Sequence, residues 1–263
     1  GRGLVAHQWM RERPLRVTRM EKRFAILGDL HSNSDALRAV IDDARGQSVT
    51  DFLCVGDIVG YNADPVTCIA LVRDELAAVT VRGNHDHYCA YDEHLGDFQP
   101  LAASAVDWTR RQLSEADVAW LRDLPLQKLH MGVGLVHSTL DMPDRWGYVF
   151  DLLDAEAHFN YQSTTLSFHG HTHVPIVFSK QGGDVFRYEP STFHVAIGTK
   201  YFINVGSVGQ PRDGDPRSSY VIFCPRSKTI EFRRVAYDVE AAMERNAQAN
   251  LPERLIKRLA IGR

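Results

Sequence analysis

The chain has few cysteines and no spacing that would use them together. Its 263 residues include four cysteines, and no two of them form a C-x-x-C pair. Cys54 lies within an apolar run and Cys224 ends another, so we expect buried free thiols. The sequence therefore excludes a disulfide framework and a cysteine-rich zinc module.

Long hydrophobic runs are also missing. No apolar stretch approaches the roughly 18 residues that a membrane-spanning helix requires. The N-terminal segment is basic and contains no apolar signal-peptide core. We therefore expect a cytoplasmic protein with no membrane partner.

Positive charge is scarce outside the N-terminus. The net charge is −3, but residues 1–23 hold seven Lys/Arg and two Asp/Glu, which leaves −8 for the remainder. An acidic body argues against nucleic acid as a partner and disfavours a nuclease. Residues 1–20 are predicted to be a basic, disordered extension, or to precede a true start at Met20. Residues 21–263 are expected to form a single domain.

What the chain does have is one device used four times: a short apolar run, a glycine, and then a side chain able to bind a metal. Each run is too short for a helix and reads as a buried strand. The glycine permits a sharp turn and a close approach to an ion. The four runs are 24–29, 52–57, 79–84 and 166–171.

The order of predicted elements indicates an α/β fold. The first ninety residues alternate strand and helix, which is typical of parallel strands covered by helices. A helical insert is predicted at about 88–125, and the chain past 165 is mostly β. We expect two stacked mixed sheets with helices outside. Strands are predicted at 24–28, 52–55, 79–82, 126–130, 133–136, 165–169, 174–179, 185–188, 200–205, 218–223 and 228–235. Helices are predicted at 34–45, 65–76, 100–112, 114–124, 151–158, 238–248 and 253–260.

The candidate metal ligands cluster at strand ends. Asp29-x-His31 and His171-x-His173 each place two ligands at i and i+2, which extended backbone turns to one face. Carboxylate, amide and imidazole together favour Mn²⁺, Fe or Zn²⁺ over Ca²⁺. Seven ligands suit two ions that share a carboxylate. The seven are Asp29, His31, Asp57, Asn84, His137, His171 and His173.

These residues resemble the calcineurin-like metallophosphoesterases. The matching blocks, in order, are Asp29-Leu30-His31, Gly56-Asp57, Gly83-Asn84-His85-Asp86, His137 and Gly170-His171-Thr172-His173. A further run, Asn204 to Asp215, looks like a block of a bacterial and archaeal subgroup. The resemblance implies a four-layer α/β/β/α sandwich of two mixed sheets flanked by helices.

The resemblance also implies a role for each ligand. One ion would be held by Asp29, His31 and His173, and Asp57 would bridge to the other. The second ion would take Asn84, His137 and His171. Many members have Gly-Asp-x-x-Asp, whereas this chain has Gly60 in place of the second acid. That acid is not a metal ligand in the family.

The implied reaction is hydrolysis of a phosphate ester. Two divalent ions and two aspartates leave the site with a charge of +2, which complements a phosphate. The ions would polarise the phosphoryl oxygens, and a bridging hydroxide would attack in line. His85, paired with Asp86, would protonate the leaving oxygen or stabilise the transition state. The substrate would be a small phosphomonoester or phosphodiester, with nucleotides among the candidates.

Residues for substrate binding are less well marked. Arg212 is predicted to approach the phosphate together with the Gly206-Ser207 turn, or that turn braces the metal site from behind. Tyr61 and Asn62 are predicted to line the entrance, and the segment 146–148 to form an aromatic wall. A non-catalytic metal-binding scaffold for protein contacts is the alternative from another functional class.

Overall fold

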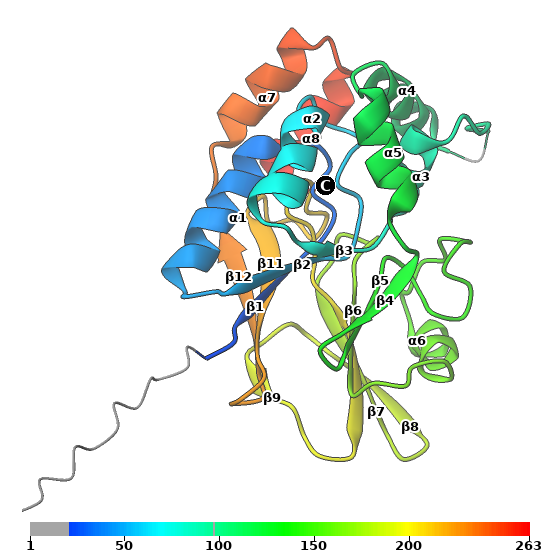
Figure 1. The fold of residues 1–263 in the computed structure, drawn as a ribbon, viewed down its shortest axis with the longest axis vertical. Helices are drawn as coiled ribbons and strands as arrows, with labels where there is room; N and C mark the ends of the chain where they lie inside the picture. The colour runs from blue at the N-terminus through cyan, green and yellow to red at the C-terminus, as the bar shows by residue number, and fades with distance from the viewer. Residues whose placement is uncertain (1–20, 97) are drawn as a thin grey trace, which may run out of the picture.

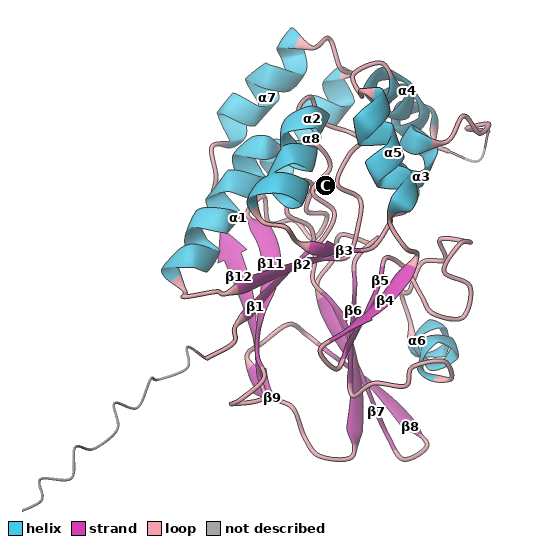
Figure 2. Cartoon of the chain, in the orientation of Figure 1, coloured by secondary structure: helices cyan, strands magenta, loops and turns pink. Residues whose placement is uncertain are grey.

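Two six-stranded sheets lie face to face and carry helices on their outer sides (Figures 1 and 2). The computed structural model describes residues 21–96 and 98–263, so the predicted extension 1–20 lies outside the described residues. No helix in the described part of the chain is long and apolar enough to span a bilayer.

The first sheet carries the N-terminal strands. Its first three strands, β3, β2 and β1, run parallel, and β11 joins β1 in antiparallel register with Phe24 opposite Phe223. In sheet order the strands are β3 (Val79–Thr80), β2 (Asp51–Cys54), β1 (Phe24–Leu27), β11 (Ser218–Cys224), β12 (Thr229–Val235) and β9 (Phe193–His194).

The second sheet is built from the middle of the chain. Its central strands β5, β6 and β10 run parallel, with Leu166 opposite both Val133 and Tyr201. In sheet order the strands are β4 (Gln127–His130), β5 (Val133–Val136), β6 (Leu166–His169), β10 (Thr199–Asn204), β7 (Ile176–Gln181) and β8 (Asp184–Tyr188).

Helices cover both outer faces, and Figure 1 shows most of them on the side of the first sheet. Only α6 of the described helices packs against the second sheet. The helices are α1 (Ser34–Gly46), α2 (Pro65–Ala70) with a π-helical turn (Leu71–Glu75), α3 (Asn84–Ala90), α4 (Pro100–Arg110), α5 (Glu115–Asp123), α6 (Leu152–Phe159), α7 (Val239–Gln248) and α8 (Glu253–Ile261).

Side chains along β1 alternate between two hydrophobic cores, and this packing joins the layers of the fold. Ala25 and Leu27 face α1 in the outer core, whereas Phe24 and Ile26 face the second sheet. Because successive side chains of a strand point to opposite faces, one apolar run serves two cores. A third core lies between the second sheet and α6, around Phe202. The predicted α/β/β/α sandwich is confirmed.

The sequence missed two elements and misjudged a third. Helix α3 was not predicted because its residues are mostly polar and show no apolar period. Strand β9 has only two residues. The helix expected over 65–76 continues from α2 as a π-helical turn from Leu71.

Candidate metal centre

All seven predicted ligands lie at one edge of the two sheets. The parallel strands β1, β2, β5 and β6 end there, so their following residues meet across the interface between the sheets. Three groups of ligand atoms each fall within 4.8 Å of one another. The first is Asp29, His31 and His173, the second is Asp57, His137 and His171, and the third, His31, Asp57 and His85, shares a member with each of them. Asn84 joins the second group, with its Oδ1 atom 3.1 Å from Nε2 of His137.

The i, i+2 spacing predicted extended backbone at these ligands, but the structure has left-handed backbone there. Asp29 and His31 have φ of 51° and 45°, and Asp57 has φ of 54°. His171 and His173 have φ of 71° and 61°. Left-handed backbone is unfavourable for residues with a Cβ and is concentrated at functional sites. The prediction of convergence holds, but tight left-handed turns produce it.

Two glycines of the motifs make room for ligands from other strands. A Cβ at Gly83 would collide with the carboxylate of Asp57, and one at Gly170 with that of Asp29. Each glycine therefore admits the aspartate of a neighbouring strand into the cluster. This explains why the glycine precedes the ligand at both positions.

Backbone carbonyls fix the tautomer of three histidines. His31 Nδ1 faces Val59 O at 3.1 Å, and His173 Nδ1 faces Gln210 O at 2.6 Å. His137 Nδ1 contacts a carbonyl at 2.8 Å in the same way. A carbonyl only accepts, so each Nδ1 carries the proton and leaves Nε2 as the ligand atom.

His171 is oriented in the opposite sense. Its Nε2 donates to Trp146 O at 2.8 Å, which leaves Nδ1 facing the cluster. Its ring also stacks on Tyr148, with centroids 4.1 Å apart. The loop that contains Trp146 thus sets the orientation of one ligand, a role that no sequence motif signalled.

The donor atoms fit metal ions and fit poorly without them. Burial holds the pKa of both His31 and His173 well below the usual range, so both rings are neutral. Their Nε2 atoms lie 3.1 Å apart, and each presents a lone pair to the other. Two such acceptors repel unless a cation lies between them. Asp29 Oδ1 lies 3.5 Å from His173 Nε2 and completes a mixed N/O set.

Asp57 lies between the two groups. Its Oδ2 atom is 3.5 Å from His31 Nε2 and 3.3 Å from His137 Nε2. Burial opposes ionisation, yet the charges of His137 and His85 hold the pKa of Asp57 well below its usual range. Burial raises the pKa of Asp29 to about 7. One carboxylate therefore faces both groups in ionised form.

His137 is protonated where Asp57 is ionised, because the two groups shift each other's pKa in opposite directions. Although burial opposes it, the nearby charge of Asp57 raises the pKa of His137 to about 9. A proton therefore occupies this pair in the metal-free protein, and metal binding must displace it. Burial lowers the pKa of His171 to about 3, so that ring is already neutral.

His85 stands beside the cluster at the start of α3. Its backbone N donates to Asp57 Oδ1 at 2.8 Å, and its ring lines a cleft. The ring centroid is 4.8 Å from that of His31, and Nδ1 has no hydrogen-bond partner within the described structure. Burial lowers the pKa of His85 to about 4.

The predicted pairing of His85 with Asp86 is wrong. Asp86 instead accepts hydrogen bonds from the backbone N of Asp57, Ile58 and Val59, at 2.8–3.2 Å. It also accepts from Gly83 N at 2.9 Å. Its carboxylate ties the turn after β2 to the start of α3, so it is a positioning residue.

The cleft above the cluster has a volume of about 830 Å³. Tyr61 and Arg212 line it as predicted, and so do Trp146 and Tyr148. Asn62 does not reach it. The buried amide of Asn62 instead donates to His31 O at 2.7 Å and accepts from Asn246 at 2.7 Å.

Behind the cluster, the predicted Gly206-Ser207 turn acts as a brace. Ser207 Oγ donates to Asp29 O at 2.8 Å, and the side chain is buried. Of the two interpretations of this turn, the structure favours support of the metal site over contact with a phosphate.

Three further arginines line the cleft but belong to no motif: Arg145, Arg254 and Arg258. Arg254 and Arg258 come from α8, more than 80 residues past the last ligand, His173. Their spacing of four places both on one helix face, next to the buried Leu255 and Leu259. That amphipathic pattern was the only available signal, and it did not reveal which surface α8 covers.

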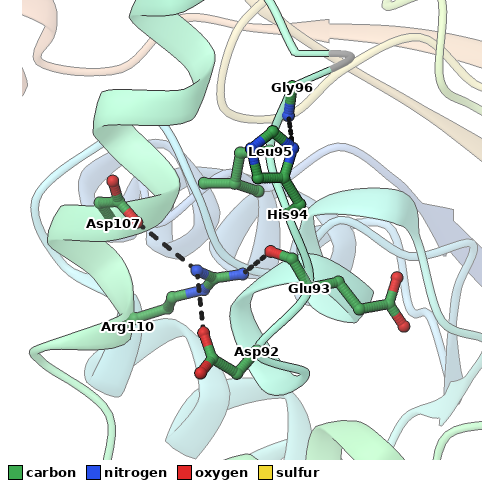
Figure 3. A pocket seen from close by; sticks show the side chains of 7 residues that line it. All are labelled: Asp92, Glu93, His94, Leu95, Gly96, Asp107 and Arg110. Atoms are coloured by element: carbon green, nitrogen blue, oxygen red, sulfur yellow. Dashed lines mark hydrogen bonds and ion pairs between the residues drawn. The ribbon is translucent and has the colours of Figure 1, made fainter.

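The helical segment on the other side of the cleft is anchored by Arg110 at the end of α4. Figure 3 shows its guanidinium between the loop that follows α3 and Asp107. It donates to Tyr88 O, Tyr91 O and Glu93 O at 2.8–3.0 Å. These bonds fix the loop whose continuation, from Phe98, lines the cleft.

The chain is similar to known proteins in sequence and in structure. The family model for the calcineurin-like phosphoesterase superfamily domain matches residues 23–228. An uncharacterized protein of Methanocaldococcus jannaschii is 38% identical over 249 residues, covering 93% of this chain and all of that protein. A solved metallophosphoesterase from Sphaerobacter thermophilus is 37% identical, with a TM-score of 0.81 over 92% of this chain and all of that chain. A symmetrical bis(5'-nucleosyl)-tetraphosphatase of Aromatoleum aromaticum is 31% identical over 121 residues, 43% of each chain.

Proposed function

We propose that this chain, which belongs to the calcineurin-like phosphoesterase superfamily, hydrolyses a small phosphate ester. Two bound divalent metal ions would support this reaction. The chain is thus a phosphoesterase of a metal-dependent family. The main support for two ions is Asp57, whose carboxylate faces ligand groups on both sides.

The ligands would divide as the resemblance implies. Asp29, His31 and His173 would hold one ion, and Asn84, His137 and His171 the other. When bound, Mn²⁺, Fe or Zn²⁺ ions supply positive charge that polarises phosphoryl oxygens and lowers the pKa of a water. The mixed N/O donor set does not choose among these metals.

The protein's own groups would position the ester and stabilise its charge. His85 lines the cleft beside the cluster, and its neutral ring retains one N–H. That N–H would donate to an oxygen on which negative charge develops, in a site that excludes water. Arg212 lines the same cleft with its guanidinium 5.5 Å from the Tyr61 ring centroid, and it would bind a phosphate oxygen.

A nucleotide is the substrate that the cleft suits best. Rings of Tyr61, Phe98, Trp146 and Tyr148 line it, and such faces stack on planar bases. The relative from Aromatoleum aromaticum is named for a nucleotide substrate, which supports the same class.

Substitution of the shared carboxylate tests the mechanism. Asp57→Asn should lower kcat/KM for p-nitrophenyl phosphate by at least roughly a thousandfold, since several kcal/mol of charge stabilisation depends on the ions it joins. Elemental analysis of the same Mn²⁺-loaded preparation should show less metal per chain than in the wild type.

His94→Ala is the matched control, because His94 is exposed and belongs to neither ligand group. It should retain wild-type activity and metal content. A wild-type protein that binds two ions and hydrolyses neither monoesters nor diesters would instead support the non-catalytic scaffold. An active Asp57→Asn variant would exclude the shared-carboxylate mechanism.

A further inference from the structure

The cleft is lined by four arginines from three parts of the chain. Arg145 belongs to the loop that also contains Trp146, and Arg212 follows β10. Arg254 and Arg258 are one turn apart on α8. The residues that line the cleft include no aspartate or glutamate.

Two arginines outside the cleft show a different arrangement. Arg233 and Arg245 pair with Asp43 and Asp35, at 2.6 and 3.2 Å. None of the four cleft arginines forms an ion pair with a carboxylate in the part of the chain that the structure describes. Their positive charge is therefore balanced by no acid within the cleft.

Tyr61 connects the arginines of α8 to the metal cluster. Its ring centroid lies 4.5 Å from that of His85 and 6.0 Å from the guanidinium of Arg258. Arg212 contacts the same ring at 5.5 Å. Arg258 thus lies one aromatic ring beyond the site where a phosphate would react.

The crowding of like charges has an electrostatic cost. Burial and the charges of Arg212 and Arg254 lower the pKa of Arg258. The only hydrogen bond of its guanidinium within the described chain is a long one, 3.5 Å, to Gln210 Oε1. An anion in the cleft would neutralise these charges and satisfy guanidinium donors that no carboxylate of the protein reaches.

We propose that Arg254 and Arg258 form an anion subsite for a second phosphate of the substrate, beyond the phosphate that is hydrolysed. This inference rests on the proposed function, because the subsite opens into the same cleft. The preferred substrates would carry two or more phosphates, either contiguous as in a nucleoside diphosphate or spaced as in a sugar bisphosphate. The α8 arginines would determine specificity and leave the reacting atoms to the metal centre.

Binding measurements with two probe pairs test the subsite. Calorimetry compares AMP with ADP, and glucose 6-phosphate with glucose 1,6-bisphosphate, at saturating Mn²⁺. The titrations use the full chain with His85→Ala, which keeps every proposed metal ligand and slows turnover. The second phosphate should tighten binding at least roughly tenfold in one of the two pairs, because charge-assisted bonds to phosphate are strong. The pair that responds identifies contiguous or spaced phosphates.

Variants of α8 assign the effect to its arginines. Arg254→Gln should reduce the preference for the second phosphate by roughly threefold, and the double variant with Arg258→Gln should abolish it. Lys257→Gln is the matched control: it removes one charge from the same helix, at an exposed residue paired with Glu253 outside the cleft. It should leave all four affinities unchanged.

The inference is overturned if neither pair shows a preference, or if Arg254→Gln weakens one-phosphate and two-phosphate ligands equally. Hydrolysis of p-nitrophenyl phosphate and of bis(p-nitrophenyl) phosphate by the wild type is measured separately. A protein that lacks both activities but shows the arginine-dependent preference would refute the proposed function and retain the subsite.

Discussion

The inner and outer parts of the cleft are built in different ways. The inner part is the metal cluster, whose ligands follow strand ends in short motifs and are almost fully buried. The outer part draws Arg145, Phe98 and Arg258 from a loop, the segment before α4 and the last helix. Chemistry that depends on fixed atoms therefore uses strand ends, whereas the walls that contact the rest of a substrate use helices and loops. Apart from the loop of Trp146, which orients His171, such walls can change without disturbing the cluster.

His85 lies at the boundary between the inner and outer parts of the cleft. Among the tests of this comparison, its substitution is expected to have the largest effect on activity. His85→Ala should reduce kcat by roughly 10²–10⁴-fold, the usual contribution of a positioned catalytic side chain. Elemental analysis should show an unchanged metal content, because His85 Nδ1 and its ring lie outside the proposed ligand sets. A loss of metal together with activity would place His85 among the ligands and move the boundary outward.

A second effect separates the two parts by pH. In the metal-free protein Asp29 has a pKa of about 7 and His137 of about 9, so both hold protons at pH 6. Metal binding displaces these protons, and affinity should therefore rise with pH. Mn²⁺ titrations should show a dissociation constant at least roughly tenfold lower at pH 8 than at pH 6.

Arginine side chains stay charged between pH 6 and pH 8, so the outer part of the cleft should respond to pH differently from the metal cluster. The preference for a second phosphate should change little between pH 6 and pH 8 once the metal sites are saturated. A flat Mn²⁺ affinity over the same range would contradict the protonation of the cluster.

The smallest effect should come from the anchor of the outer wall. Arg110→Lys keeps the charge but replaces the planar fork of Nε and Nη2, which donates to three separate carbonyls, with a single nitrogen that cannot reproduce this geometry. Urea unfolding should show a loss of about 1–2 kcal/mol, as for hydrogen bonds of a partly exposed charged group. Arg111→Lys, at an exposed neighbour, should leave stability unchanged. A fall in metal content in Arg110→Lys would mean that the two parts are coupled.

The same division explains what could be predicted from the sequence. The ligands were visible because strand, glycine and ligand lie within six residues in four blocks, and the isolated His137 follows a further strand. The left-handed turns at Asp29 and His171 were not visible, since backbone conformation there is imposed by packing against another strand. The predicted pairing of Asp86 with His85 was wrong because the sequence position is the same for a catalytic partner and for a carboxylate that accepts backbone N–H groups.

The outer wall was invisible for a different reason. Arg254 and Arg258 acquire a role only when α8 packs beside α4, where Leu255, Ala102 and Ala105 share a small core with Tyr61. Nothing near these arginines in the sequence specifies that contact. The same holds for Trp146, whose backbone carbonyl orients His171.

The left-handed turns at the sheet edge have a consequence for metal loss. Each residue in left-handed backbone carries strain on the order of 1–3 kcal/mol. Five of the proposed ligands have this conformation at one edge of the sheets. In a metal-loaded protein the cations would clamp these turns, whereas chelation would leave the strain opposed only by neighbouring hydrogen bonds. Amide exchange after chelation should accelerate first at this edge while the two apolar layers stay protected, so the ions would serve as fasteners of the fold as well as reagents.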